Sequence, residues 1–174
     1  MERTLTLRVA LTDDLSGVDA LLARSYPRLL APDYPPSVMV TALPVIARAR
    51  PSLLASGRYY VVVDLAGRIL GAGGWSLAAP ATEGASAEQQ LAGTGHVRHL
   101  VTDPAALRKG IAAAIMAEVL GAARIAGVRR MECLSTRMAV PFYAAQGFVV
   151  MGAEVDVPLG PGIVFPAVPM QRQL

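Results

Sequence analysis

Alternating and helically spaced apolar residues predict an ordered series of elements in the first half of the chain. The stretch 4–10, TLTLRVA, alternates in polarity and predicts a strand, and a Thr-Asp-Asp cap then predicts a helix over 14–26. Two runs rich in β-branched and aromatic residues over 58–77 flank a Leu-Ala-Gly turn, which predicts a β-hairpin. The proline-rich stretch 27–51 predicts irregular backbone, with short helical pieces on either side of Pro44.

The second half alternates between strand-like and helix-like stretches. It opens on residues 78–95, which are small and polar without a period and predict a mobile loop. After this loop the patterns predict a strand over 95–102, a helix over 111–127, a strand over 128–136, a short helix over 139–146, and strands over 148–157 and 161–174. Three prolines weaken the prediction of the last strand.

Strands that alternate with helices around a hairpin are typical of a mixed α/β (α+β) sheet. No internal repeat or linker divides the sequence, so residues 1–174 are predicted to form a single domain that is long enough for a sizeable core. A doubly wound dinucleotide-binding sheet is less favoured. The glycines of GAGGWS at 71–76 lack the G-x-G-x-x-G spacing, and no helix is predicted to follow them.

Composition narrows the class of protein. The chain is 53% hydrophobic, and 30 of its residues are alanine, which predicts a packed core built from small and branched side chains. The single cysteine, Cys133, excludes an internal disulfide, and we expect it in the core rather than as a nucleophile. The start, MERTLTLRVALTDD, is too polar for a signal peptide, and Glu118 and Arg124 interrupt the longest apolar run. These features predict a cytoplasmic protein outside the membrane.

A net charge of +3 and a pI near 9.4 raise the question of nucleic-acid binding. The fifteen arginines are scattered, with 129–130 the only adjacent pair, and no basic stretch is interleaved with aromatic residues. We therefore expect no nucleic-acid partner, because acidic small molecules explain a modest positive balance equally well.

The sequence DPAALRKGIA, residues 103–112, places two cations where a helix is predicted to begin. Cations at a helix N-terminus are mildly unfavourable, because the free backbone N–H groups there carry partial positive charge. A bound anion would reverse that cost, and Gly110 would let it approach the backbone closely. The pattern fits a phosphate site, but it also fits an ordinary strand-to-helix turn with two solvated cations.

Two motifs between His96 and Phe148 decide between these interpretations. Residues 107–112, LRKGIA, follow Thr-Asp-Pro and match Arg/Gln-x-x-Gly-x-Gly/Ala, while residues 139–148, AVPFYAAQGF, match Ala-x-x-Phe-Tyr-x-x-x-Gly-Phe. Both are signatures of the GNAT superfamily of acetyl-coenzyme A-dependent N-acetyltransferases. The motifs stand in the family's order, with an intervening helix and strand of suitable length. The second half of the chain therefore resembles a GNAT acetyltransferase.

The resemblance implies a mainly antiparallel central sheet flanked by helices, with a V-shaped splay between the fourth and fifth strands. Acetyl-coenzyme A would be the cosubstrate in that splay. Backbone groups of Leu100, Val101 and Thr102 would pair with its pantetheine arm, and Thr136 stands where many members have an asparagine that touches coenzyme A. The N–H groups that would cradle the diphosphate belong to Arg108, Lys109, Gly110, Ile111, Ala112 and Ala113.

The resemblance also implies direct acetyl transfer to a primary amine of a small molecule or peptide. Tyr143 matches the family's tyrosine general acid, although packing beside Phe142 would also explain it. His96 resembles the position of a catalytic glutamate in histone-type members and is the first candidate base. Glu132 on the neighbouring strand is the second. A surface histidine, a salt-bridged glutamate and a water relay are the alternatives.

Strict alternation along the predicted strand 95–102 would place His96, Arg98, Leu100 and Thr102 on one face and His99 on the other. Two histidines on opposite faces do not share a metal ion, so we expect no metal site.

Two departures from the family pattern favour a competing class of protein. Leu107 stands where the family usually has arginine or glutamine, and Thr136 replaces the common asparagine. A non-catalytic module that senses acyl-coenzyme A and acts through a protein partner would explain both, whereas the retained Tyr143 favours the enzyme. The acceptor amine is not identified by any motif, and a homodimer is compatible with the resemblance.

Overall fold

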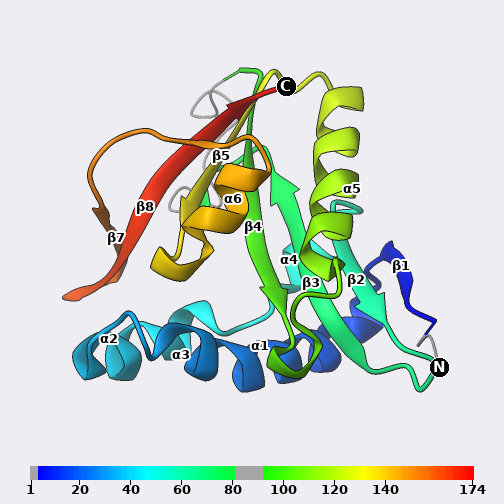
Figure 1. Cartoon of the computed structure of the whole chain (residues 1–174), viewed down its shortest axis with the longest axis horizontal. Helices are drawn as coiled ribbons and strands as arrows, with labels where there is room; N and C mark the ends of the chain where they lie inside the picture. The colour runs from blue at the N-terminus through cyan, green and yellow to red at the C-terminus, as the bar shows by residue number, and fades with distance from the viewer. Residues whose placement is uncertain (1–3, 81–91) are drawn as a thin grey trace.

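The computed structural model describes residues 4–80 and 92–174 and shows a central sheet with helices against both faces (Figure 1). The strands are β1 (Thr6–Val9), β2 (Tyr59–Val63), β3 (Ile69–Ser76), β4 (Thr94–Thr102), β5 (Arg130–Ser135), β6 (Val149–Val150), β7 (Val155–Gly160) and β8 (Ile163–Gln173). The helices are α1 (Leu15–Leu30), α2 (Pro36–Thr41), α3 (Leu43–Ile46), α4 (Pro51–Leu54), α5 (Ile111–Ile125) and α6 (Val140–Ala145). Short 3-10 turns are η1 (Thr12–Asp14), η4 (Pro104–Ala106) and η5 (Arg137–Ala139). Most of the loop predicted over 78–95 lies outside the described residues.

The strands lie in the order β1-β2-β3-β4-β5-β8-β6, with β7 paired to β8. Every paired neighbour is antiparallel except β4 and β5, which run parallel. The predicted hairpin over 58–77 is confirmed as β2 and β3, joined by a turn in which the Gly67 N–H donates to the Asp64 carbonyl at 2.9 Å. The mixed, mainly antiparallel sheet of the sequence prediction is therefore the one observed.

The fourth and fifth strands separate after a short paired segment. β4 and β5 are in register only from Thr94 to His96 against Arg130 to Glu132. Beyond these residues β5 pairs with β8 on its other side and β4 continues with β3, so the two strands diverge (Figure 1). The predicted V-shaped splay is thus present, and it opens a space inside the sheet.

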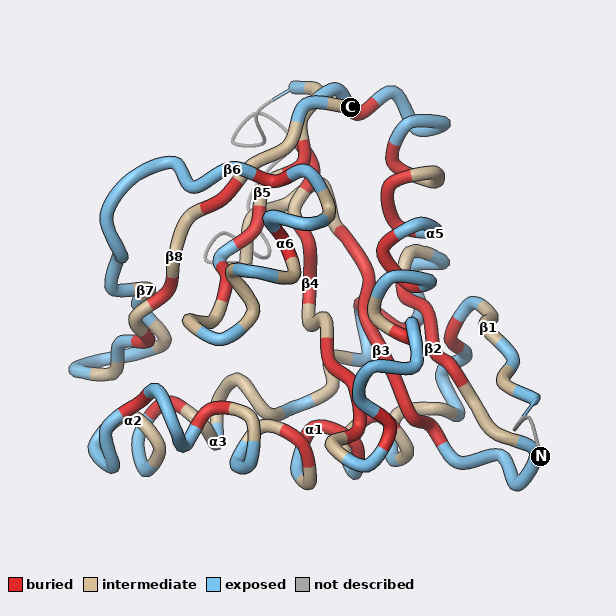
Figure 2. Tube along the Cα trace, viewed as in Figure 1, coloured by how far each residue is buried: buried red, intermediate tan, exposed pale blue. Residues whose placement is uncertain are grey.

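Each face of the sheet carries its own core (Figure 2). On one face α5 packs against β2, β3 and β4 through a cluster that contains Ile115, Met116 and Trp75. On the other face α1 and α4 pack against β2 and β3 around Leu21 and Tyr59. The two layers hold the splayed strands from opposite sides.

Glycines in β3 set how closely α5 approaches the sheet. A Cβ at Gly73 would stand 3.3 Å from Cγ2 of Ile115, and one at Gly71 would stand only 2.3 Å from Cγ2 of Ile111. Real side chains do not approach so closely, so only glycine permits this packing. The first turn of α5 is therefore pressed against β3, beside the splay.

The region predicted to be irregular, residues 27–51, is more helical than its prolines suggested. Helix α1 runs through Pro27 to Leu30, and α2 and α3 follow, with Pro44 inside the first turn of α3 rather than between helices. Burial explains the longer α1, because Leu30 is 1% exposed and packs in a third cluster with Phe165 of β8. Pro44 is tolerated because the first N–H groups of a helix need no internal partner.

Of the last two predicted strands, the first differs from observation and the second is confirmed as β8. Residues 148–157 form two separate strands, β6 and β7, rather than one. Val150 pairs with Met170 of β8 and Val155 pairs with Ala167, so the four residues 151–154 span a gap of only two residues in β8 and interrupt the pairing. The last strand, β8, is eleven residues long despite its prolines. Both Pro166 and Pro169 use their carbonyls as acceptors, from the Tyr34 hydroxyl and the Met151 N–H. Proline removes only the donor, so the strand persists.

Candidate active site

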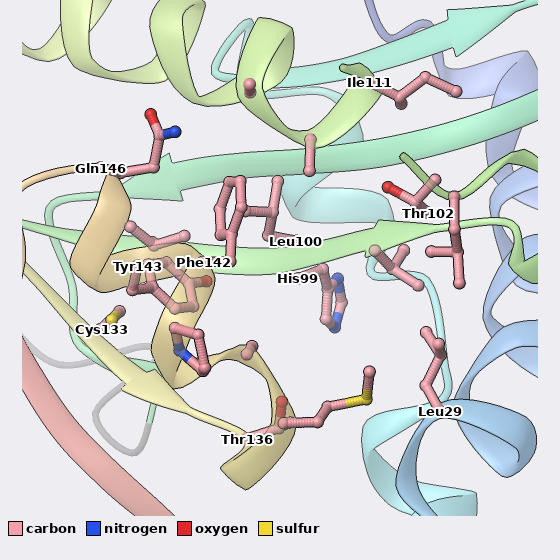
Figure 3. A pocket seen from close by; sticks show the side chains of 18 of the residues that line it. Leu29, His99, Leu100, Thr102, Ile111, Cys133, Thr136, Phe142, Tyr143 and Gln146 are labelled. Carbon is pink, nitrogen blue, oxygen red and sulfur yellow. The ribbon is translucent and has the colours of Figure 1, made fainter. Parts of the chain in front are cut away.

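A cavity of about 660 Å³ occupies the splay between β4 and β5 (Figure 3). Its walls come from the second half of β4, the start of α5, the β5–α6 segment and the end of α1. The predicted residues that line it are Leu100, Val101, Thr102, Arg108, Gly110, Ile111, Ala112, Ala113, Thr136 and Tyr143. Lys109, His96 and Glu132 are not among its lining residues.

The start of α5 has the backbone geometry of an anion cradle. Arg108 and Gly110 both lie in the left-handed region, with φ of 59° and 75°, so the chain turns sharply into the helix. The first hydrogen bond of the helix runs from the Ala114 N–H to the Gly110 carbonyl. The N–H groups of residues 111–113 precede it and therefore have no partner within the helix. A Cβ at Gly110 would meet nothing within 4 Å. Residues 110–113 also line the cavity, so the start of the helix, with its dipole, lies at the cavity wall.

Asp103 fixes the segment that precedes this cradle. Its side chain is almost fully buried and accepts hydrogen bonds from Arg24 at 2.7 Å, Arg68 at 2.9 Å and the Ala105 N–H at 2.9 Å. Burial raises the pKa of Asp103, but the Ala105 N–H and the two guanidiniums outweigh it, so the pKa falls below its ordinary value. The ionised carboxylate ties the start of η4 to α1 and to the turn between β2 and β3.

A β-bulge in β4 changes which residues face the cavity. Ala72 pairs with Val101 and Gly74 with Arg98, so two residues of β4 stand opposite Gly73 alone. The first of the two, His99, has a φ of 48°. Val97 packs in the α5-side core, whereas Val101, four residues on, packs in the α1-side core.

The predicted alternation is therefore wrong beyond Arg98. The bulge brings His99, Leu100, Val101 and Thr102 together on the cavity wall. His99 lies beside the buried Tyr59, whose hydroxyl is 3.3 Å from its Nδ1 atom. Figure 3 shows the His99 ring reaching into the space between β4 and α1. The sequence pattern did not predict His99 as a site residue.

Tyr143 enters the cavity from α6, between Cys133 of β5 and Leu100 of β4 (Figure 3). It is 6% exposed, and its ring packs edge-to-face against Phe142 and Phe148, with centroids 5.5 and 5.3 Å away. Burial, followed by the proximity of Cys133 and another tyrosine, raises the pKa of Tyr143 well above 10. The phenol therefore stays protonated throughout the physiological range and can act as a proton donor.

His96 and Glu132 stand side by side in a second cavity, of about 370 Å³, at the closed end of the splay. The Nδ1 atom of His96 is 3.7 Å from Oε2 of Glu132. Burial lowers the pKa of His96 more than Glu132 raises it, so the imidazole is neutral at pH 7 and can accept a proton. The two cavities share Val97, Cys133 and Leu134 in their walls.

Further lining residues carried no sequence signal beyond membership in a motif. They include Tyr26 and Leu29 of α1, together with Cys133, Met138, Phe142 and Gln146. Burial raises the pKa of the Cys133 thiol to about 12, so a thiolate nucleophile is scarce at neutral pH. Within residues 4–80 and 92–174, no group of three or more His, Cys, Asp or Glu side chains could hold a metal ion. In the same ranges no helix is long and apolar enough to cross a membrane.

Comparison with known proteins identifies the family. The chain matches the model of the acetyltransferase (GNAT) domain over residues 32–174. Among curated proteins, no sequence shows a significant match. The chain therefore belongs to the GNAT family, and it is an acetyltransferase.

Solved structures share the fold at low sequence identity. A GCN5-related N-acetyltransferase from Rhodopseudomonas palustris is 18% identical, with a TM-score of 0.73 over 100% of this chain and 99% of that one. The PaiA N-acetyltransferase of Thermoplasma acidophilum, crystallised with coenzyme A, is 13% identical, with a TM-score of 0.69 over 98% and 99%. N-acetylglutamate synthase from Neisseria gonorrhoeae, complexed with coenzyme A and N-acetyl-glutamate, is 18% identical, with a TM-score of 0.63 over 100% of this chain but 36% of that one.

Proposed function

We propose that the protein transfers the acetyl group of acetyl-coenzyme A directly to the primary amine of a small molecule or peptide. The observation that carries the proposal is the cavity in the splay. It has an anion cradle at one end and a protonated phenol in its wall. The solved structure of N-acetylglutamate synthase, complexed with coenzyme A and N-acetyl-glutamate, supports a small amine acceptor.

The residues present fit the cosubstrate along its whole length. The N–H groups at the start of α5 and the side chain of Arg108 would bind the diphosphate, with Lys109 adding charge from outside the cavity. The bulged segment of β4, residues 99–102, offers backbone groups to the pantetheine arm because β5 has left that edge. Thr136 lies in the opposite wall. When bound, acetyl-coenzyme A supplies an activated thioester.

The proton steps fall to three side chains. An alkylamine with a pKa of about 10 is mostly protonated at neutral pH, so it must lose a proton before it attacks. His96 accepts that proton directly or through water, and Glu132, 3.7 Å away, stabilises the imidazolium that forms. Tyr143 donates its proton as the thiolate departs, which lowers the barrier to breakage of the C–S bond.

The proposal is tested by incubating the protein with acetyl-coenzyme A and a panel of amines and measuring the release of free thiol. We expect thiol release that depends on both the amine and the protein, with the acetylated amine visible by mass spectrometry. The buried Cys133 should contribute little background. Saturable binding of acetyl-coenzyme A without release on any amine would instead establish the non-catalytic sensor that the Leu107 and Thr136 departures suggest.

A further inference from the structure

The segment that leads from β4 into the anion cradle has an unusual backbone conformation. Arg108 has a φ of 59°, which costs energy for a residue with a side chain, and Gly110 follows with a φ of 75°. Such a conformation persists only where the surrounding structure imposes it. The contacts along residues 103–111 therefore determine where the N–H groups at the start of α5 lie.

Three anchors hold this segment. At its end, Ile111 packs closely against Gly71 of β3. In its middle, Ala106 is buried in the core cluster beneath α5. At its start, the Asp103 N–H donates to the Leu70 carbonyl at 2.8 Å, and the Asp103 carboxylate accepts from two guanidiniums. The first two anchors are apolar contacts, whereas the third joins the segment to other elements through ion pairs.

Arg24 of α1 is the better placed of the two guanidinium partners of Asp103. Its Nε atom donates to the carboxylate at 2.7 Å, and its Nη2 atom donates to the Ile69 carbonyl of β3. Both contacts are made at once because the donors of a guanidinium form a rigid fork. The Arg24 side chain is 29% exposed, against 56% for Arg68, so solvent screens its charge less. The link between α1 and the cradle segment therefore depends chiefly on Arg24.

This link lies outside the cavity but next to it. Asp103 and Arg24 are not among the residues that line the cavity, whereas Thr102 and Ala106, on either side of Asp103, are. Tyr26, two residues after Arg24 on α1, also lines it. An effect of the ion pair on a bound ligand must therefore pass through the backbone of the cradle segment.

We propose that Asp103 and Arg24 are positioning residues for the cosubstrate: their ion pair holds the cradle in the conformation that binds the diphosphate of acetyl-coenzyme A, without touching it. This assignment rests on the proposed acetyl transfer and adds two residues that determine cosubstrate affinity. Without the ion pair, the two apolar anchors remain and the fold persists. The segment gains conformational freedom, however, which the ligand must remove when it binds, so the affinity falls.

Asp14, at the start of α1, offers a matched control for Asp103. Its carboxylate accepts from both Nη atoms of Arg8, at 2.8 and 3.0 Å, and from the Leu11 N–H at 2.7 Å. Like Asp103, it is thus held by two guanidinium N–H groups and one backbone N–H, and these hydrogen bonds lower its pKa. Neither Asp14 nor Arg8 is a lining residue of the cavity. Asp14→Asn therefore removes an equivalent ion pair that does not support the cradle.

Calorimetric titration with coenzyme A tests the assignment without needing turnover. A hydrogen bond to a charged group changes an equilibrium about tenfold to hundredfold, and a contact that acts through the backbone transmits part of this. We therefore expect the Kd for coenzyme A to rise about three- to thirtyfold in Asp103→Asn and Arg24→Gln, and less in Arg68→Gln. Asp14→Asn should bind as wild type does. Equal weakening in Asp14→Asn would overturn the assignment, because it would show a general loss of stability.

Two further variants keep the test decisive if Asp103→Asn does not fold. Arg24→Lys retains the positive charge but cannot donate to Asp103 and Ile69 through one rigid fork, so it should weaken binding by a smaller factor than Arg24→Gln. In the double variant Asp103→Asn/Arg24→Gln, the Kd should be little higher than in the weaker-binding single variant, because both residues act through one contact. Fully additive effects would show that they act separately and would overturn the pair.

Steady-state kinetics distinguish positioning of the cosubstrate from a general disturbance of the site. In Arg24→Gln the KM for acetyl-coenzyme A should rise, whereas the KM for the amine and the kcat at saturating acetyl-coenzyme A should stay as in wild type. Tyr143 and His96 stand on other elements, α6 and β4, so the proton steps should not change. An equal loss in kcat would overturn the assignment.

The outcomes separate this assignment from the proposed function. If the wild type does not bind coenzyme A, both the proposed function and the positioning role are overturned. If the wild type binds coenzyme A and the folded Asp103 and Arg24 variants bind it equally well, the positioning role falls and the proposed function stands. Binding that is weakened in these variants and retained in Asp14→Asn supports both.

Discussion

Replacing Tyr143 with phenylalanine separates the chemical role of the phenol from its packing. The ring contacts Phe142 and Phe148, and these contacts survive the change. Because the ring and its packing are kept, loss of the hydroxyl should change the free energy of unfolding by no more than about 1 kcal/mol. Loss of a general acid should lower kcat about 10²–10⁴-fold, which is roughly 3–5 kcal/mol of activation free energy.

The assay for Tyr143→Phe is steady-state acetylation of a confirmed amine, with KM for acetyl-coenzyme A measured in parallel. We expect kcat to fall and that KM to stay, because the proton is needed only as the thiolate departs. Because burial holds the pKa of Tyr143 well above 10, wild-type kcat should also show no alkaline decline up to about pH 9.5. Tyr26→Phe, a phenol in the same cavity, is the control. Unchanged kcat in Tyr143→Phe, or equal loss of cosubstrate binding, would refute the reasoning.

Three further changes test other parts of the structure. Asp103→Asn should lower the free energy of unfolding by about 1–3 kcal/mol, measured with urea at pH 7. This difference between wild type and variant should shrink below about pH 4, because the wild type loses the stability of a carboxylate with a lowered pKa as it protonates, and a pH-independent difference would contradict this. His96→Asn should lower kcat/KM at neutral and alkaline pH, where the imidazole with its lowered pKa is a neutral base, whereas a larger loss in His99→Asn would move the base to the bulge. Gly71→Ala should destabilise by about 1–3 kcal/mol, since its Cβ would overlap Ile111 of α5, and a neutral effect on thermal unfolding would contradict the packing.

Features that depend on local sequence were predictable. The hairpin over 58–77 follows from two β-rich runs around a turn that Asp64 and Gly67 close. Helix α5 follows from apolar residues at helical spacing, and its buried face contains Ile111, Ile115 and Val119, as that spacing requires. Most residues of the motif at the start of α5 line one cavity wall. This was predictable because the conformation of a turn and of a helix start is determined by residues that are neighbours in the chain.

Features that depend on distant residues were not predictable. The bulge in β4 arises from register against Gly73 and Gly74 of β3, so the orientation of His99 cannot be read from its own strand. A small cavity lined by Arg50 and Arg98 exists because the segment between α3 and α4, the strand β4 and the β7–β8 hairpin converge there. Strand β8 tolerates its prolines because partners on both sides use its carbonyls and remaining donors.

The central claim, that the splay binds acetyl-coenzyme A with its diphosphate at the start of α5, is tested most directly by calorimetric titration of Gly110→Val. A valine there adds a branched side chain to the cavity wall that residues 110–113 form. Gly127→Val is the matched control, because Gly127 follows the other end of α5 with a similar φ of 82° and equally open surroundings. Both variants carry the same backbone strain. We predict saturable 1:1 binding in the wild type and in Gly127→Val, and loss of binding in Gly110→Val. Normal binding by folded Gly110→Val would contradict the account.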